Sequence, residues 1–334
     1  MSLYYSFIIP VYNRPEEIRE LLESFLLLEN QEIHYEIIVV EDGSTLSSKN
    51  TVKEFKEKLP LFYYYKENSG PGDSRNYGMK RAKGNYFIIL DSDVLLPSDY
   101  LKNIHAFLKD SYTDCFGGAD AAHPSFTAIQ KAINFAMTSF LTTGGIRGNE
   151  KAIEKFKPRS FNMGISKKAY ETTGGFGKMR VGEDLDLSIR LQAAGFNTAF
   201  IPNATVYHKR RNTWKTFYKQ VSNFGKGRPA LNKWYPQTFS VLFWLPSLYF
   251  IGILISLSLI LFKVYIFIVL YLIYFLLIFV SSSYIYNNLN VGIYSILAAN
   301  LQLIGYGLGF LKATYYINLR KREPRDVFPE LFIE

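Results

Sequence analysis

Two aspartates directly after an apolar run are the residues whose type and spacing point most clearly to chemistry. Asp91-Ser92-Asp93 follows the run Asn85–Leu90, which reads as a buried strand. Two carboxylates one residue apart at a strand end offer hard oxygen ligands, which suit a Mg²⁺ or Mn²⁺ ion that bridges a diphosphate. The alternative is a turn that only caps the helix after Pro97. The preceding strand favours the metal site.

A second acidic segment and a histidine also follow expected strands. Glu41-Asp42-Gly43-Ser44 comes after the second strand, where a carboxylate can accept a hydrogen bond from a nucleobase N–H or a ribose hydroxyl. An ordinary strand-to-helix turn with Ser44 or Ser47 as N-cap is the alternative. His208 ends the last expected strand. A lone histidine is more often structural, but an imidazole beside the two aspartates would suit Mn²⁺.

A third acidic cluster opens a helix at Gly182-Glu183-Asp184-Leu185-Asp186. Acidic residues in a first helical turn ordinarily complement the helix dipole. Three acids in four residues exceed that need, so one of them is a candidate general base. We expect Asp186 to point away from the other two.

Two further segments suit a nucleotide. Pro10-Val-Tyr-Asn-Arg14 follows the first strand, and there Tyr12 would stack on a base while Arg14 would meet phosphate. Gly70-Pro-Gly-Asp-Ser-Arg75 is a glycine-rich entry to a helix, so its backbone amides and Arg75 would face an anion. For Arg14, a solvated position near a helix start is the alternative.

The elements that must position these residues alternate between apolar strands and amphipathic helices. This pattern predicts an α/β fold with a mostly parallel sheet covered by helices, in which ligands bind beyond the carboxyl ends of the strands. The expected strands are 5–9, 35–40, 61–65 and 85–90, with helices at 15–28, 47–59 and 70–83. Later in the chain we expect a loop at 142–148, strands at 160–166, 198–201 and 205–208, and a helix at 183–194.

Charge divides the chain into two regions. Residues 1–186 carry 25 acids and 23 bases, whereas Leu187 to Arg322 contains no acid and 14 Lys and Arg. This asymmetry indicates a membrane or nucleic-acid partner for the second region, and its long apolar runs favour the membrane over nucleic acid. Cys115 is the only cysteine, which excludes an intrachain disulfide and fits a reducing compartment. The first residues do not resemble a signal peptide.

Apolar runs begin near Val241. Val241–Phe262 and Val264–Ser283 are uncharged and separated only by Lys263, so they predict a tight hairpin of two membrane spans. Val291–Leu311 is a weaker third run. Three spans would place Arg320-Lys-Arg322 opposite a cytoplasmic first domain, against the positive-inside rule. Two spans plus an interfacial third segment would keep both ends inside, and we favour that arrangement.

A basic belt precedes these runs. Aromatic residues lie among its cations, which predicts an amphipathic helix that touches anionic lipid headgroups. The cations are Lys209, Arg210, Arg211, Lys215, Lys219, Lys226, Arg228 and Lys233. We therefore expect four regions: 1–208, 209–240, 241–317 and a C-terminal tail at 318–334.

Taken together, these motifs resemble family 2 glycosyltransferases with a GT-A nucleotide-sugar-binding domain and C-terminal membrane segments. The resemblance covers about residues 5–228. The motifs that carry it are Ile8–Arg14, Val39–Ser44, Gly70–Asn76, Leu90–Asp93, Asn162–Ile165, Gly174–Phe176, Gly182–Arg190 and Val206–His208.

The resemblance implies a role for each matching residue. Pro10 and Tyr12 would flank the nucleobase, and Glu41 would read it where the family usually has Asp. Arg75 and Ser92 would lie near the nucleotide. Asp91 would contact ribose or metal, Asp93 and His208 would bind the metal, and Asp184 would be the catalytic base.

The implied reaction is a single displacement with inversion, in which a nucleotide sugar, with uridine favoured over guanosine, donates to a lipid-linked or membrane-proximal hydroxyl. The Gln-x-x-Arg-Trp segment of processive synthases is missing, so transfer of one sugar is expected. A polyprenyl-phosphate sugar synthase and a non-catalytic nucleotide-sugar-binding scaffold remain as alternatives. The expected location is the inner cell membrane, multi-pass, with the first domain on the cytoplasmic side.

Overall fold

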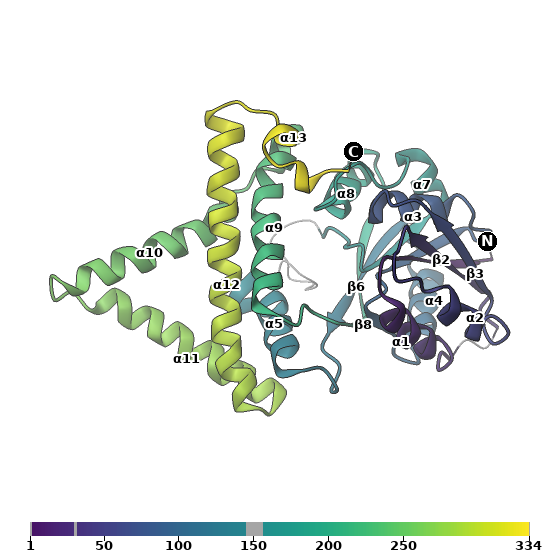
Figure 1. The fold of residues 1–334 in the computed structure, drawn as a ribbon, viewed down its shortest axis with the longest axis horizontal. Coiled ribbons are helices and arrows are strands. Elements are labelled where there is room, and N and C mark those ends of the chain that lie inside the picture. Colours follow the sequence, from purple (N-terminus) through teal and green to yellow (C-terminus); the bar gives the residue numbers. More distant parts are fainter. Residues whose placement is uncertain (1, 30–31, 145–155, 334) are drawn as a thin grey trace. The chain divides into compact units, whose positions relative to one another are not determined.

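The computed structural model describes residues 2–29, 32–144 and 156–333 (Figure 1). Internal contacts divide the chain into two compact units. The first, which we call the sheet unit, consists of residues 1–123, 146–209 and 333–334. The second, the helical unit, consists of residues 124–145 and 210–332.

The sheet unit is built on a mixed sheet of eight described strands in the order β3-β2-β1-β4-β7-β6-β8-β5. Two strands, β7 and β5, run antiparallel to their neighbours, and the other six share one direction. The prediction of a mostly parallel sheet is therefore confirmed. The strands are β1 (Tyr5–Val11), β2 (Tyr35–Asp42), β3 (Leu61–Lys66), β4 (Tyr86–Leu90), β5 (Val94–Leu95), β6 (Cys115–Ala121), β7 (Asn162–Ser166) and β8 (Thr198–His208).

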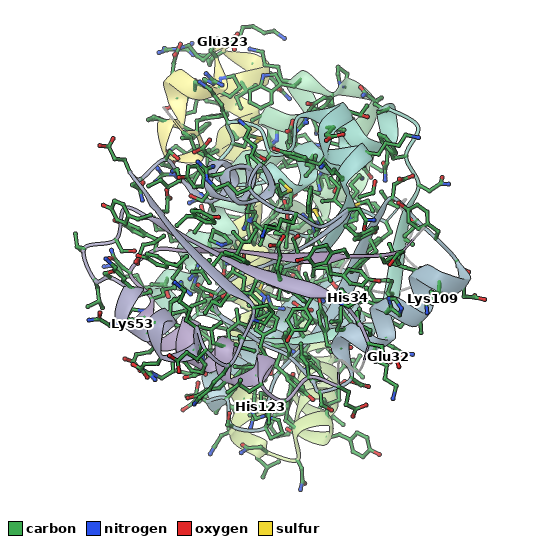
Figure 2. The ribbon with its side chains drawn as sticks, turned by 90° about the vertical axis from the view of Figure 1, so that its right-hand side faces the viewer. Glu32, His34, Lys53, Lys109, His123 and Glu323 are labelled. Carbon is green, nitrogen blue, oxygen red and sulfur yellow. The ribbon has the colours of Figure 1, made fainter. Side chains whose placement is uncertain are left out.

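Alternate residues of the central strands face two separate cores. Phe7 and Ile9 of β1 pack with α1, α2 and α4, whereas Ile8 packs on the opposite face with α3, α7 and α8. Polar helix positions point outward, as Lys53 of α2 and Lys109 of α4 show (Figure 2). The helices are α1 (Pro15–Phe25), α2 (Lys49–Phe55), α3 (Pro71–Met79), α4 (Tyr100–Asp110), α7 (Lys167–Thr173) and α8 (Glu183–Ala193).

The sheet departs from the sequence prediction at β8 and β6. The two short strands expected at 198–201 and 205–208 are one strand, because a break in its register with β6 accommodates Pro202, which has no N–H to donate. β6 itself was not predicted, since Gly117 and Gly118 lower its strand propensity. Gly118 is needed there because a Cβ would overlap the backbone carbonyl of Ala204.

The helical unit contains α5 (Ala128–Thr138), α6 (Phe140–Thr143), α9 (Trp214–Trp234), α10 (Leu245–Ile260), α11 (Ile266–Tyr286), α12 (Leu289–Ala313) and α13 (Pro324–Val327). Short 3₁₀ turns, η1 (Pro236–Thr238), η2 (Val241–Trp244) and η4 (Pro329–Leu331), join some of them, and α12 continues into a π-helical segment, η3 (Thr314–Leu319). α5 was not predicted. Thr142 and Thr143 of the expected loop at 142–148 are helical, and residues 145–148 lie outside the described part.

Three helical segments are long and apolar enough to cross a membrane: Val241–Ile260, Ile266–Tyr286 and Leu289–Leu319. The first two correspond to the expected hairpin, with its turn around Lys263. The third is longer than the sequence pattern suggested. α10 and α11 diverge from their shared turn, and each meets α12 at a different level (Figure 1).

Candidate active site

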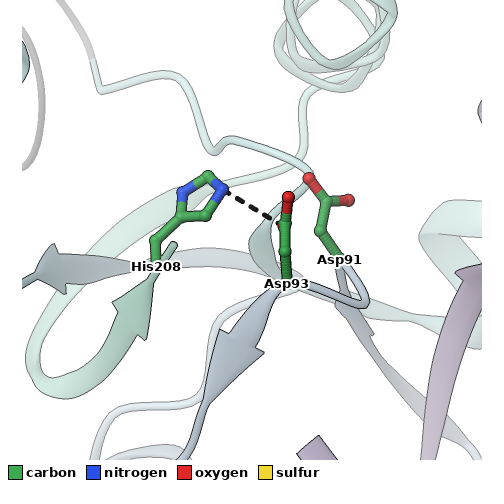
Figure 3. A group of neighbouring side chains, drawn as sticks. All are labelled: Asp91, Asp93 and His208. Atoms are coloured by element: carbon green, nitrogen blue, oxygen red, sulfur yellow. Dashed lines mark ion pairs between the residues drawn. The ribbon is translucent and has the colours of Figure 1, made fainter. Parts of the chain in front are cut away.

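The aspartate pair and the histidine come together at one edge of the sheet. Asp91, Asp93 and His208 each offer a ligand atom, and these atoms lie within 4.8 Å of one another (Figure 3). Two carboxylates and one imidazole form a mixed oxygen and nitrogen donor set that fits Mn²⁺ or Mg²⁺. Ligands about 2.1 Å from a shared ion lie roughly 3–4 Å apart, and the 3.4 Å between His208 Nε2 and Asp93 Oδ1 falls in that range. These three residues therefore form a candidate metal site.

Strand pairing produces this convergence from residues more than a hundred positions apart. β4 ends at Leu90, and the chain turns through Asp91 and Asp93 into β5. β5 pairs with the end of β8 so that Val94 lies opposite His208. The backbone N–H of Lys209 donates to the carbonyl of Asp93 over 2.8 Å, which fixes the two segments together.

His208 is held from both sides of its ring. Its Nε2 lies 3.4 Å from Asp93 Oδ1, and its Nδ1 lies 3.9 Å from Asp120 Oδ2 on β6. The Phe161 ring stacks on the imidazole with 4.8 Å between ring centroids. A carboxylate behind a histidine orients the ring and increases the basicity of the nitrogen that faces a metal.

Two arginines neutralise the aspartate pair. Arg14 Nη1 lies 2.5 Å from Asp93 Oδ2, and Arg75 Nη2 lies 2.7 Å from Asp91 Oδ1. Arg75 is 3% exposed and its other nitrogen donates to Glu183 over 2.9 Å. Burial alone would lower the pKa of Arg75, but the charges of Asp91 and Glu183 outweigh it and raise that pKa. One buried guanidinium thus connects the aspartate loop to the start of α8.

The three acids of the α8 cluster have different surroundings. Burial raises the pKa of Glu183 to about 7, although the Arg75 charge acts in the opposite direction. Asp184 accepts a hydrogen bond from the Leu185 N–H, and its nearest cation is Arg159 at 3.8 Å. Asp186 forms an ion pair with Arg190 one turn later. Asp184 is therefore the least engaged carboxylate of the three.

Some of the residues predicted to contact the nucleotide are accessible to solvent, and others are buried within the protein. Tyr12 is 50% exposed and Pro10 is half-buried at the end of β1. Ser92 is buried within the aspartate turn. Glu41 is fully buried and accepts hydrogen bonds from Ser47, the Ser48 N–H and Tyr63. Burial alone would raise the pKa of Glu41, but these hydrogen bonds outweigh it and lower that pKa.

Comparison with known proteins identifies the family. The model for "Glycosyl transferase family 2" matches residues 6–174, about half of the chain. The chain belongs to glycosyltransferase family 2.

Named relatives share part of the chain. The poly(ribitol-phosphate) beta-N-acetylglucosaminyltransferase TarS of Staphylococcus aureus is 33% identical over 112 residues, which are 33% of this chain and 20% of that protein. The probable glycosyltransferase YdaM of Bacillus subtilis is 25% identical over 233 residues, 66% of this chain and 54% of that protein. The chain thus spans about a fifth to a half of these relatives' lengths.

A solved structure supports the fold. The mannosyltransferase PcManGT from Pyrobaculum calidifontis, in complex with GDP-Man and Mn²⁺, superposes with a TM-score of 0.52 at 19% identity. The match covers 67% of this chain and 63% of that one. The expected GT-A fold of this family 2 glycosyltransferase is confirmed.

Sequence reasoning missed Asp120 and the position of Glu183 in this family 2 site. Asp120 ends β6, and a strand-end carboxylate was the signal used to find Asp91, but β6 itself was not recognised. Glu183 was identified as part of an acidic cluster, while its ion pair with Arg75 joins positions 108 apart. Only the folded sheet brings these positions together.

Proposed function

We propose that this chain is an inverting, metal-dependent glycosyltransferase that moves one sugar from a nucleotide-diphosphate sugar to a hydroxyl group of a membrane-associated or lipid-linked acceptor in glycan biosynthesis. The main support is the ion-pair chain Asp91–Arg75–Glu183, which holds the candidate metal ligands close to the start of α8 and therefore to Asp184. In this proposal the donor site and the proton acceptor belong to one cluster linked by ion pairs, which would hold the reacting groups in a productive geometry.

The donor in this proposal is a nucleotide sugar, with uridine favoured over guanosine. The names of two relatives specify N-acetylglucosaminyl and glucosyl transfer onto poly(ribitol-phosphate). Tyr12 and Pro10 would flank the base, Glu41 would contact it, and Ser92 and Asp91 would lie near the ribose. Because Glu41 already accepts three internal hydrogen bonds, we expect base contact there to require a rearrangement of the Ser47–Ser48 turn.

Asp91, Asp93 and His208 would hold the metal ion in this mechanism. A divalent cation supplies positive charge against the diphosphate leaving group. Arg14 and Arg75 bring two further positive charges to the same edge, and Asp184 accepts the proton of the attacking hydroxyl as the bond to the anomeric carbon forms. Asp184 suits this role because its two neighbours, Glu183 and Asp186, are each paired with an arginine.

An Asp184→Asn variant tests the base. We expect transfer to fall about 10²–10⁴-fold, the usual contribution of a positioned general base, while the nucleotide still binds with Mn²⁺. Nucleotide binding is measured by the melting-temperature shift with a panel of nucleotide sugars, and transfer by release of nucleoside diphosphate. Glu171→Gln, on the exposed side of α7, is the control. Near-normal transfer by Asp184→Asn would show that another group is the base.

The same experiment separates the alternatives. A polyprenyl-phosphate sugar synthase uses a phosphate acceptor, which needs no strong base, so its activity would survive Asp184→Asn. A non-catalytic scaffold would bind a nucleotide sugar without releasing nucleoside diphosphate in either form.

We also propose that the protein is a multi-pass component of the cell membrane, with the sheet unit on the cytoplasmic side and anionic lipids as partners. Three long apolar helices and the cations of α9 support this. Fractionation of cells that express the full chain tests it. Recovery in the soluble fraction without detergent would contradict membrane attachment and leave the proposed reaction unaffected.

A further inference from the structure

Among the three candidate spans, α12 is the one most extensively packed within its own unit. Of the three candidate spans, its most apolar window is 39% buried, against 17% for the first and 11% for the second. α10 and α11, in contrast, expose leucine, isoleucine and phenylalanine around most of their circumference. The hairpin α10–α11 therefore requires lipid around it, whereas α12 is already covered along much of its length by protein.

The helix that covers α12 is the basic helix α9. Phe217 and Val221 of α9 pack in one cluster with Val291 and Ala298 of α12. Glycines bring the two backbones together further along, since a Cβ at Gly225 would overlap the carbonyl of Tyr306. A Cβ at Gly309 of α12 would likewise overlap the backbone carbonyl of Ser222 of α9. Such close contact leaves no room for lipid between the helices.

These contacts extend over most of α12. Trp214, at the start of α9, makes an edge-to-face contact with Tyr294, and the glycine contacts reach Gly309. Fifteen helical residues span about 23 Å, which is most of the roughly 30 Å thickness of a bilayer core. If α12 crossed the membrane, α9 would have to cross beside it.

The composition of α9 does not permit that crossing. The helix carries five cations and no acid within 21 residues, and Lys215 and Lys219 are exposed. Charged side chains are costly in the hydrocarbon core unless they are paired or face water. At a membrane surface the exposed Lys215 and Lys219 can face anionic headgroups, which is favourable.

The positions of the hairpin ends lead to the same conclusion independently. The Ser247 hydroxyl, in the first turn of α10, donates to the carbonyl of Gly307, late in α12. α11 ends beside the start of α12, where Ser283 faces Gly292. Three successive crossings would put the start of α10 and the late part of α12 on opposite sides of the membrane, but the structure puts them side by side.

We propose that α9 and α12 lie together on the cytoplasmic membrane surface, and that the α10–α11 hairpin alone crosses the bilayer. Both ends of the hairpin pack against α12, and its turn at Lys263 would reach the far leaflet. Tyr249 of α10 donates to Asn300 of α12, which holds the hairpin to this surface, and Tyr271 of α11 donates to the Tyr249 carbonyl, which joins the two hairpin helices. Tyrosine is favoured at the membrane–water boundary.

This arrangement places nearly all cations of the region on one side. The α9 lysines and the segment Arg320–Arg322 would be cytoplasmic, and Lys263 alone would be outside. The partner of the surface is therefore an anionic lipid leaflet. The inference rests on the membrane attachment proposed above and is independent of the reaction.

Cysteine labelling of the full chain tests the sidedness. The native Cys115 is buried, so the wild-type protein is the unlabelled control. Single variants Lys263→Cys, Lys321→Cys and Lys219→Cys are treated with a membrane-impermeant maleimide in intact cells and in inverted vesicles. We expect Lys263→Cys to react only in intact cells and the other two only in inverted vesicles. Reaction of Lys321→Cys in intact cells would show a third crossing, and no reaction of Lys263→Cys there would show that the hairpin does not cross.

A depth measurement on reconstituted protein provides a second test that does not depend on sidedness. Spin labels are placed at the exposed α12 positions Ile293 and Leu308, with Leu257 of α10 as the deep reference. An α12 that lies on the surface keeps the first two labels at similar shallow depth, above the third. A spanning α12 would separate them by about 23 Å in depth, which would overturn the proposal.

Discussion

The two units of this protein handle charge in opposite ways. At the sheet edge of the sheet unit, Arg14 and Arg75 face Asp93, Asp91 and Glu183 at 2.5–2.9 Å, so that cations and carboxylates interlock. In the helical unit there is no acid before Glu323. Two α9 cations reach acids only in the C-terminal tail, where Lys226 meets Glu330 and Lys233 meets Glu323.

The difference matches the ligand that we propose for each unit. Interlocked charges fix the geometry of a small site, in which a displacement of 1 Å would be costly for catalysis. Exposed cations without neighbouring acids, such as Lys215 and Lys219, would be able to adapt to a fluid lipid surface. The sheet unit is therefore expected to respond to single isosteric substitutions, and the helical unit to changes in packing or in lipid composition.

The largest expected effect is that of Asp93→Asn. Loss of this carboxylate removes one candidate metal ligand and leaves Arg14 without its partner, so we expect sugar transfer to fall at least about 10³-fold, roughly 4 kcal/mol of transition-state stabilisation. Mn²⁺ binding measured by calorimetry should be lost in parallel. The exposed Asp110→Asn is the control. A variant that binds Mn²⁺ normally would exclude Asp93 from the metal site.

Asp120→Ala should have a smaller effect on the same metal. Without the carboxylate beside Nδ1, the His208 ring loses its orientation, and Mn²⁺ affinity should fall about 10–100-fold. Nucleotide binding without metal should stay unchanged, and calorimetry with each ligand measures both quantities. Equal weakening of both would show that Asp120 supports the fold and not the metal site.

Gly309→Leu is the corresponding change in the helical unit. A larger side chain there would force α12 away from Ser222 of α9, and overpacking of this kind costs about 1–3 kcal/mol. We expect a lower melting temperature in detergent with nucleotide affinity preserved. Leu308→Ala, on the exposed side of α12, is the matched control. A loss of nucleotide binding would show that the units are not independent.

The last prediction concerns the pH dependence of stability. Because the folded pKa of Glu183 is raised to about 7 from an ordinary value of 4.5, the folded state binds more protons than the unfolded state between these values. The contribution of Glu183 to stability is therefore present at low pH and is lost as pH rises through 7, by about 1.4 kcal/mol per pKa unit. Glu183→Gln should flatten the melting temperature between pH 4.5 and 7. An unchanged slope would contradict a buried, protonatable Glu183.

The sequence was sufficient for the elements whose pattern is local. The apolar strands β1 to β4, the Asp91–Asp93 pair after β4 and the hydrophobic hairpin could all be identified from runs of neighbouring residues, since burial on both faces leaves continuous apolar stretches. β6 was not identified because Gly117 and Gly118 weaken its strand pattern. α5 was not identified although Thr127 and Gln130 form a capping box at its start.

Whatever depends on distant residues was decided only by the tertiary structure. His208 reaches Asp93 because β5 pairs with β8. Arg75 of α3 joins Asp91, which follows β4, to Glu183 at the start of α8. Composition likewise shows that α12 is apolar enough to enter a membrane, but its packing against α9 and α10 determines what surrounds it. The local sequence determines whether a segment favours a strand, a helix or an apolar environment. Long-range contacts then determine where in the fold that segment lies and which residues it meets.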